Sequence, residues 1–295
     1  MATRTNRQPN NPATALRAYL ELVKFSHTLF ALPFALASML VAARGFPEPR
    51  IFGWIVAAMI GARTAAMGFN RIVDRHIDAR NPRTQNRELP AGKVSLRGAV
   101  VLVVLASALF FFAAFQLNFL ALILAPLTLL TLFFYSFCKR FTSLSHFVLG
   151  LCLGIAPVGA WVAVTGKIEL APVVLCAAIL VWTAGFDIIY ATMDIDFDRA
   201  AGLHSMVAKL GVAHALAFAK ILHALFLVFL LVFGILAQLG PLFLVATAFI
   251  GAFLVYEHRL VHPDDLRRVN AAFFTVNGSI SVFFLCVVAG IILWP

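Results

Sequence analysis

Two groups of polar residues at the ends of apolar stretches have the types and spacing to do chemistry. The first group begins at Arg63 and continues as Asn70-x3-Asp74-x3-Asp78. At about 100° per residue of an α-helix, these four side chains fall within about 80° of one another. We therefore expect them to form one polar face on a helix.

The second group repeats part of this pattern further along the chain. It consists of Asp187, Tyr190, Asp194 and Asp198. Asp196 lies about 180° from Asp194 if the helix continues, and is then expected to point away from the others. Asp194 and Asp198 each follow their counterparts Asp74 and Asp78 by 120 residues. This equal separation indicates an internal pseudo-repeat.

Two facing pairs of carboxylates on separate helices predict a site for Mg²⁺. This ion prefers carboxylates, water and substrate phosphate oxygens in octahedral geometry, so such a site would bind a diphosphate through the metal. The alternative is that the carboxylates are solvated helix ends that pair with Arg71, Arg75 and Arg199. That alternative does not explain Asp187 and Arg63, which lie inside apolar stretches, where a charge costs on the order of 3 kcal/mol.

Basic residues near both groups are suited to donate hydrogen bonds to non-bridging phosphate oxygens. These are Arg83, Arg87, Lys93 and Lys139, the last following Tyr135 by one turn. Other basic residues are explained well enough as topology signals or contacts to anionic lipid. They are Arg4, Arg7, Arg97, Arg140, Arg259, Arg267 and Arg268. His76 and His204 lie close in sequence to the two acidic groups. For both histidines, contact with a substrate is the less favoured interpretation.

The elements that must position these residues are membrane-spanning helices. Hydrophobic residues make up 62% of the 295 residues and charged residues 12%, with a mean hydropathy of +0.95. Soluble domains are about 45–50% apolar and about 25% charged, so this composition excludes an ordinary soluble domain. The apolar stretches lack the alternation of barrel strands and approach the length of about 20 residues that crosses a bilayer. They cover 26–43, 51–70, 99–115, 119–137, 144–164, 170–192, 212–236, 241–256 and 272–293.

The expected fold class is therefore all-α, a polytopic membrane protein with nine transmembrane helices. With the N-terminus in the cytoplasm, 18 of the 23 Lys and Arg fall on the cytoplasmic side and 3 on the other, as the positive-inside rule predicts. We expect the inner (cytoplasmic) membrane, a cytoplasmic tail over 1–24 and a single domain over 25–295. Both acidic groups then lie on the cytoplasmic side. The four widely spaced cysteines are expected to be free thiols.

Four segments, taken in order, resemble the UbiA superfamily of intramembrane aromatic prenyltransferases. They are Asn70-Arg-Ile-Val-Asp74-Arg-His-Ile-Asp78, Arg83-Thr-Gln-Asn-Arg87-Glu-Leu-Pro-Ala-Gly, Tyr135-Ser-Phe-Cys-Lys139-Arg140 and Asp187-Ile-Ile-Tyr190-Ala-Thr-Met-Asp194-Ile-Asp196-Phe-Asp198. The resemblance implies nine transmembrane helices around a central cavity, a cytoplasmic cap, a lateral opening for an isoprenoid and dependence on Mg²⁺.

The resemblance also implies roles for individual residues. The residues matched to the metal and diphosphate site are Asn70, Asp74, Asp78, Asp194 and Asp198. Among the acids, those expected to matter most for catalysis are Asp74, Asp194 and the supporting Asp187. Diphosphate contacts are expected from Arg83, Arg87, Tyr135 and Lys139. Contacts to the aromatic acceptor are expected from Arg63 and Tyr190.

The implied reaction transfers a polyprenyl group from an allylic polyprenyl diphosphate to a ring carbon of an aromatic hydroxy acid, after Mg²⁺-assisted ionisation of the donor. The 4-hydroxybenzoate type, which serves ubiquinone biosynthesis, is the best match. The stretches Ser145-His146 and Gly202-Leu-His204-Ser205 depart from it and resemble a branch that prenylates a dihydroxynaphthoate in menaquinone biosynthesis. The expected partners are these two substrates and the lipid bilayer, with no nucleic acid. From another class, a secondary transporter for an anionic solute also places charges within a membrane.

Overall fold

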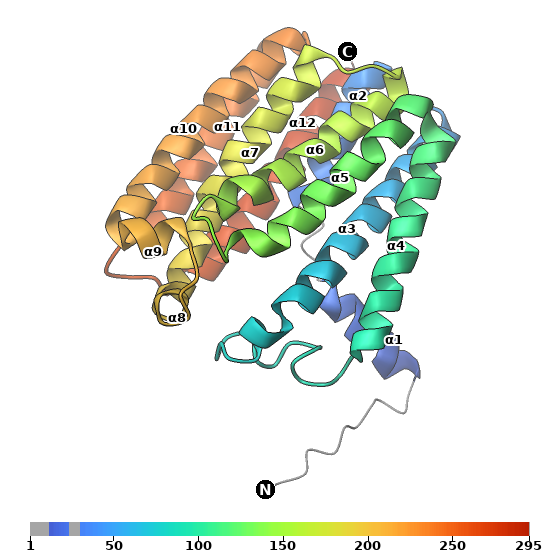
Figure 1. Cartoon of the computed structure of the whole chain (residues 1–295). Helices are drawn as coiled ribbons and strands as arrows, with labels where there is room; N and C mark the ends of the chain where they lie inside the picture. The colour runs from blue at the N-terminus through green and yellow to red at the C-terminus, as the bar shows by residue number, and fades with distance from the viewer. Residues whose placement is uncertain (1–11, 24–29, 295) are drawn as a thin grey trace, which may run out of the picture.

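The computed structural model describes residues 12–23 and 30–294, and over these residues the regular structure is helical apart from one isolated β-bridge (Figure 1). The helices are α1 (Pro12–Leu22), α2 (Leu32–Ala43), α3 (Pro49–Asp78), α4 (Leu96–Leu117), α5 (Phe119–Cys138), α6 (Ser145–Thr165), α7 (Leu170–Ala191), α8 (Ile195–Ala200), α9 (Met206–Leu210), α10 (Val212–Leu236), α11 (Gly240–Leu260) and α12 (Asn277–Leu293). A 3₁₀ turn (Thr192–Asp194) precedes α8 and a π-helical turn (Ala271–Val276) precedes α12.

Eight helical segments in the described part of the chain are long and apolar enough to cross a membrane. They are α3, α4, α5, α6, α7 together with the turn and α8 that follow it, α10, α11, and α12 together with the π-helical turn before it. The all-α polytopic fold class is therefore confirmed. The first expected span, 26–43, includes residues outside the described part, and its described portion is the shorter apolar helix α2. The count of nine spans and the cytoplasmic cap stay predictions. The four cysteines are free thiols, as expected.

The turn between α4 and α5 shows how one polar residue divides a long apolar run into two helices. Asn118 has an extended backbone, and its side-chain oxygen accepts a hydrogen bond from the Ala121 amide at 2.9 Å, which caps α5. Its side-chain nitrogen donates to the Val162 carbonyl on α6 at 2.7 Å. Because Asn is a favoured N-cap residue, the chain reverses at this point, and the expected pair of helices is confirmed.

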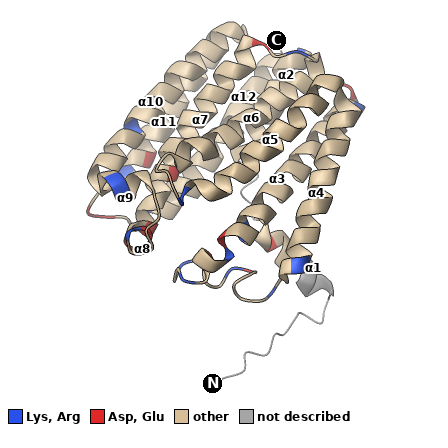
Figure 2. Ribbon diagram, in the orientation of Figure 1, with Lys and Arg blue, Asp and Glu red and all other residues tan. Residues whose placement is uncertain are grey.

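The helices lie side by side, and the charged residues gather at the end of the bundle where α8 and α9 are found (Figure 2). The segment between α3 and α4 and the helix α1 lie at this same end (Figure 1). α1 falls inside the expected tail 1–24, yet it packs on the bundle, since Leu22 is fully buried in a cluster with Val94 and Ala99. Residues 12–22 are therefore a packed helix, which the polar composition of the tail did not predict.

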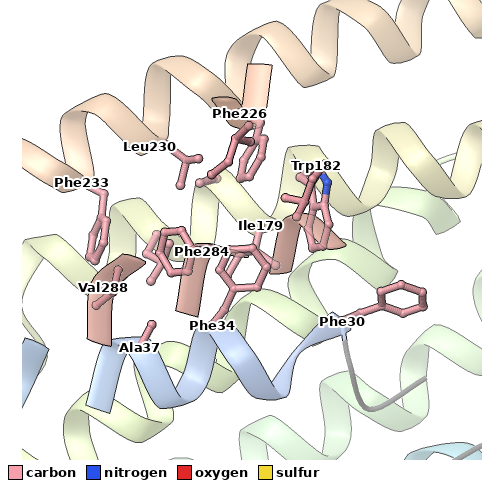
Figure 3. Packing of buried hydrophobic residues seen from close by; sticks show 14 of the residues in the cluster. Phe30, Phe34, Ala37, Ile179, Trp182, Phe226, Leu230, Phe233, Phe284 and Val288 are labelled. Atoms are coloured by element: carbon pink, nitrogen blue, oxygen red, sulfur yellow. The ribbon is translucent and has the colours of Figure 1, made fainter. Parts of the chain in front are cut away.

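Small residues allow the helices to approach one another closely. A Cβ built on Gly61 of α3 would lie 2.8 Å from the Phe110 backbone nitrogen of α4, so only glycine fits there. On the other side of the bundle, a core of aromatic side chains joins α2, α7, α10 and α12 (Figure 3). Trp182 of α7 stacks on Phe226 of α10 with ring centroids 5.6 Å apart. Such packing drives helix association in lipid, and here it fixes α7, the helix whose end carries the second acidic group.

A buried polar network also joins α10, α11 and α12. Glu257 is fully buried, and its Oε1 accepts a hydrogen bond from Asn277 Nδ2 at 2.7 Å. His223 Nδ1 lies 3.0 Å from His258 Nε2 and 3.5 Å from Glu257 Oε2. Asn277 Nδ2 also contacts the Ala272 and Phe273 carbonyls of the π-helical turn. Each of these buried polar groups depends on its neighbours for hydrogen bonds, because lipid offers no donor or acceptor to replace them.

We expect Asn277→Leu to destabilise the protein by about 1–3 kcal/mol, because it removes the donor to a fully buried carboxyl group. Thermal unfolding in detergent measures the effect. Ser279→Ala on the same helix is the matched control, because Ser279 is exposed and bonds only the Thr275 carbonyl of the preceding turn. An Asn277→Leu variant as stable as the wild type would show that the network does not hold these helices together.

Candidate functional site

A cavity of about 1310 Å³ runs between α3, α4, α5, α6 and α7 and reaches the charged end of the bundle. Its walls at that end are polar, and further in they are almost wholly apolar. Ile60 on α3 and Leu127 on α5 line the cavity and are 48% and 63% exposed. The lateral opening for an isoprenoid stays a prediction.

The residues of the first acidic group all line this cavity, so the shared polar face expected on α3 is present. They are Arg63, Asn70, Asp74 and Asp78. Asp74 is 2% exposed, and Lys139 Nζ lies 2.5 Å from its Oδ2. Asn70 Nδ2 donates to the same oxygen at 3.3 Å. The carboxylate is thus held between its own helix and the end of α5.

Arg140 is a correction to the sequence analysis, which assigned it to topology or lipid contact. Its Nη2 donates to Asp74 Oδ1 at 2.9 Å and to the Val73 carbonyl at 3.1 Å, and its Nη1 contacts the Ser136 carbonyl. Arg140 therefore helps to position the first acidic group. Its place beside Lys139, directly after α5, is the only sequence signal that pointed to this role.

Asp78 has a different set of partners. Arg87 Nη1 donates to Asp78 Oδ1 at 2.7 Å, while Arg71 Nη1 is 3.9 Å from Oδ2. Oδ2 is buried and accepts no hydrogen bond from the described residues. A buried carboxylate oxygen without a donor carries a desolvation cost. This oxygen is therefore suited to face a cation or a donor brought by a ligand.

The alternative pairing of the carboxylates with Arg71, Arg75 and Arg199 is mostly wrong. Only Arg71 approaches an acid of the two groups, at 3.9 Å. Arg75 donates to the Ile72 carbonyl of its own helix, and Arg199 contacts the Ala208 carbonyl. The carboxylates are paired instead with bases from elsewhere in the chain.

Hydrogen bonds join the segment after α3 to the second acidic group. Arg83, in the segment after α3, donates through Nε to Asp194 Oδ1 at 2.8 Å and through Nη2 to Asp194 Oδ2. It also donates to the Tyr190 hydroxyl at 2.9 Å, and Asn81 Nδ2 lies 3.2 Å from Asp194 Oδ1. Burial lowers the pKa of Arg83, but the hydrogen bonds and charge of Asp194 outweigh burial and raise it. Arg83 therefore stays a cation at the mouth of the cavity.

The second acidic group is not on one continuous helix. α7 ends at Ala191, and the 3₁₀ turn intervenes before α8. Thr192 Oγ1 donates back to the Ile189 carbonyl at 2.7 Å, a competition with the helical ladder that favours a break. Asp194 and Asp198 nevertheless both line the cavity. Asp196 is exposed and outside the cavity wall, although the continuous helix from which we expected this does not form.

Asp187 lines the cavity deeper on α7 and has a partner that the sequence did not predict. Its Oδ2 lies 2.6 Å from His146 Nδ1, and His146 Nε2 accepts a hydrogen bond from the Met206 amide at 3.3 Å. In the sequence, His146 stood out only as a departure from the pattern of related chains. The first turn of α6 places it opposite the end of α7.

The remaining predicted residues divide into two sets. Tyr135, Tyr190 and His204 line the cavity together with Arg83, Arg87 and Lys139, whereas Arg140 is outside the cavity wall. His76 is exposed and Lys93 donates to the Asn86 carbonyl at 3.4 Å, and neither belongs to the cavity wall. The structure thus gathers every predicted site residue except these two secondary candidates. Their individual roles stay predictions.

The donor set fits Mg²⁺ bound together with a phosphorylated substrate better than a prebuilt metal cage. Within the described ranges, no three His, Cys, Asp or Glu side chains converge as a metal-binding cluster. Mg²⁺ is usually held by one or two carboxylates and by substrate phosphates rather than by a dedicated protein cage. The cavity offers carboxylates from two sides, and Asp78 Oδ2 is buried without a donor among the described residues.

Comparisons with known proteins agree with this geometry. Residues 31–288 match the UbiA prenyltransferase family. The 4-hydroxybenzoate octaprenyltransferase of Vibrio atlanticus (strain LGP32) is 30% identical over 268 residues, which cover 90% of this chain and 94% of that protein. The enzyme of the same description from Vibrio cholerae serotype O1 (strain M66-2) is 33% identical over 202 residues, 68% of this chain and 71% of that one.

Two solved structures share the fold. The apo structure of a UbiA homolog from Aeropyrum pernix K1 superimposes with a TM-score of 0.81 at 36% identity, over 88% of this chain and 96% of that one. A UbiA homolog from Archaeoglobus fulgidus bound to GPP and Mg²⁺ gives a TM-score of 0.76 at 20% identity, over 93% and 99% of the two chains. The second likeness shows the common helical arrangement.

Proposed function

The chain belongs to the UbiA prenyltransferase family, and from this premise we propose that it transfers a polyprenyl group from an allylic polyprenyl diphosphate to a ring carbon of an aromatic hydroxy acid. The acceptor that we propose is 4-hydroxybenzoate, on which the named relatives act. One observation carries the proposal: carboxylates from two helix ends and three bases, Arg83, Arg87 and Lys139, gather at the mouth of a cavity that continues into an apolar channel.

The bases and carboxylates of the mouth have complementary parts in this reaction. Asn70, Asp74 and Asp78 on one side, with Asp194 and Asp198 on the other, would hold Mg²⁺ with the diphosphate. When bound, Mg²⁺ neutralises the charge that develops on the departing diphosphate. The bases then turn from the carboxylates to the non-bridging phosphate oxygens, where charge-assisted hydrogen bonds stabilise the leaving group. These bases are Arg83, Arg87 and Lys139, and Tyr135 lines the same cavity.

The apolar part of the cavity has two uses in the proposed reaction. It accommodates the prenyl chain, for which the proposed sideways exit passes the exposed apolar side chains Ile60 and Leu127 of the cavity wall. It also keeps water from the allylic cation that ionisation produces. Arg63 lies seven residues before Asn70 on α3, which places it about 10 Å deeper at 1.5 Å per residue. At that depth it is suited to bind the carboxylate of the acceptor, beyond the diphosphate, and Tyr190, which we propose also contacts the acceptor, lines the same cavity.

We further propose that the protein lies in the inner (cytoplasmic) membrane with the mouth of the cavity and the N-terminus on the cytoplasmic side. The gathering of charged residues at one end of the bundle supports this orientation (Figure 2). In this arrangement residues 25–295 make up a single catalytic domain, and residues 1–24 precede it on the cytoplasmic side.

A dihydroxynaphthoate remains the second candidate acceptor. It is favoured by His146 and His204, which both line the cavity at the two stretches that depart from the 4-hydroxybenzoate type. Both acceptors carry a carboxylate and a phenol, so Arg63 suits either one.

Incubation of membranes with Mg²⁺, geranyl diphosphate and each acceptor in turn, followed by mass spectrometry, tests the proposal. We expect a prenylated 4-hydroxybenzoate that is absent from membranes without the protein. If product forms only with the dihydroxynaphthoate, the proposed acceptor is wrong and the proposed prenyl transfer is retained. No prenylated product with either acceptor would contradict the proposed function.

A further inference from the structure

We propose that Asp187 accepts the proton that the aromatic ring loses, and that His146 is the positioning residue that holds this carboxylate toward the acceptor. This inference rests on the proposed function. It concerns the step after the new carbon–carbon bond has formed, when the attacked ring carbon carries both the prenyl group and a hydrogen. The C–H bond then breaks, its electron pair restores the aromatic ring, and the proton goes to a carboxylate oxygen of Asp187.

The neighbouring groups separate Asp187 from three other acids of the cavity, Asp74, Asp78 and Asp194, whereas Asp198 also forms no ion pair with a described residue and is hydrogen-bonded to Ser205. Lys139 and Arg140 bind Asp74, Arg87 binds Asp78, and Arg83 binds Asp194. An adjacent cation favours the ionised form of a carboxylate and makes it a poor proton acceptor. The partner of Asp187 is an imidazole instead.

The hydrogen bonds of His146 determine which of its nitrogens carries the proton and which oxygen of Asp187 is left without a donor among the described residues. The Met206 amide donates to Nε2, so a neutral imidazole carries its proton on Nδ1 and donates it to Asp187 Oδ2 at 2.6 Å. No described residue donates a hydrogen bond to the other oxygen, Oδ1. The Asp187 side chain is 19% exposed and lines the cavity, whereas His146 is 4% exposed. The dyad therefore presents one free carboxylate oxygen, held by a buried neutral donor.

Asp187 lies between the depth of Arg63 and the mouth of the cavity. Arg63 precedes Asn70 by seven residues on α3, which places it about 10 Å further in. Asp187 contacts His146 in the first turn of α6, and His146 contacts the Met206 amide of α9 at the charged end of the bundle. Both Arg63 and Asp187 line the same cavity. An acceptor whose carboxylate is bound by Arg63 would therefore extend its ring toward the mouth, where Asp187 lines the wall.

Two isotopic probes separate ionisation from proton loss in purified Asp187→Asn protein. Geranyl diphosphate with ¹⁸O at the bridging position reports ionisation, because recapture of the cation scrambles the label into the non-bridging positions. 4-Hydroxybenzoate deuterated at both carbons ortho to the hydroxyl reports proton loss. We expect scrambling at the wild-type rate, prenylated acid lowered by about 100-fold, and a primary deuterium isotope effect that the wild type lacks.

Variants of His146 test positioning, since the side-chain nitrogen of Asn can stand where Nδ1 of His stands. We expect His146→Leu to form product more slowly and to show the deuterium isotope effect. His146→Asn should form product at a rate closer to that of the wild type and show a smaller isotope effect. Asp196→Asn, an exposed carboxylate in the following segment, is the matched control and should behave as the wild type.

Three results would overturn the inference. If Asp187→Asn forms product at the wild-type rate, Asp187 does not accept the ring proton. If Asp187→Asn loses both the scrambling of the label and the product, Asp187 acts in the departure of diphosphate instead. Equal rates of product formation in His146→Leu and His146→Asn would show that His146 does not act through the hydrogen bond from its Nδ1 to Asp187. A wild-type protein that neither scrambles the label nor forms product would instead contradict the proposed function, and this outcome is recognisable before any variant is made.

Discussion

Asp74→Asn and Asp194→Asn, made separately, are each expected to lower turnover by about 100-fold or more, because each removes a charge from the group that stabilises the departing diphosphate. Asp74 lies on α3 and Asp194 in the 3₁₀ turn after α7, and both line one cavity. Asp74 is bound by Lys139 and Arg140, and Asp194 by Arg83. In either variant these bases can still bind the donor, so we expect kcat to fall much more than donor affinity.

Diphosphate release by protein purified in detergent measures this effect, and a single symmetrical peak in gel filtration shows that each variant has folded. The matched control is again Asp196→Asn, which changes an exposed carboxylate between Asp194 and Asp198 that is outside the cavity wall. The assignment of the metal site is wrong if both Asp74→Asn and Asp194→Asn keep full activity.

Arg63→Ala is expected to raise the acceptor KM by roughly 10- to 100-fold, since a charged hydrogen bond contributes about 1.5–3 kcal/mol, and to leave the donor KM nearly unchanged. Arg63 lines the cavity about two turns deeper than Asn70 on the same helix. Steady-state kinetics with each substrate varied in turn measure both constants.

The methyl ester of 4-hydroxybenzoate provides a chemical control for Arg63→Ala. Wild-type protein should bind the ester more weakly than the acid, and Arg63→Ala should hardly distinguish the two, because the ester lacks the charge that the guanidinium binds. A rise in the donor KM with no change for the acceptor would move Arg63 to the diphosphate site.

The helices were predictable because each depends on a local run of apolar residues. α5 and α10 differ from their expected ranges by at most one residue. α3 is the main exception, since the expected span 51–70 continues as helix to Asp78. Its polar last turns face the cavity, and hydropathy reports only the apolar part of such a helix.

The polar face of α3 was also predictable, because side chains on one helix keep a fixed angular relation. The pairings across the cavity were not. Arg83 reaches Asp194 over 111 residues, and Lys139 reaches Asp74 over 65. Such contacts depend on how the helices pack. For the same reason Arg140 was assigned to the membrane surface, and the partner of Asp187 was missed.

The central claim is that this cavity ionises an allylic diphosphate and passes its prenyl group to an aromatic acid. The most direct test is the stoichiometry of the reaction by purified protein in liposomes, given geranyl diphosphate and 4-hydroxybenzoate. We expect one diphosphate released for each prenylated acid when Mg²⁺ is present, and neither product when Mg²⁺ is chelated. Movement of diphosphate or acceptor across the bilayer with no prenylated acid would contradict the account and indicate a transporter.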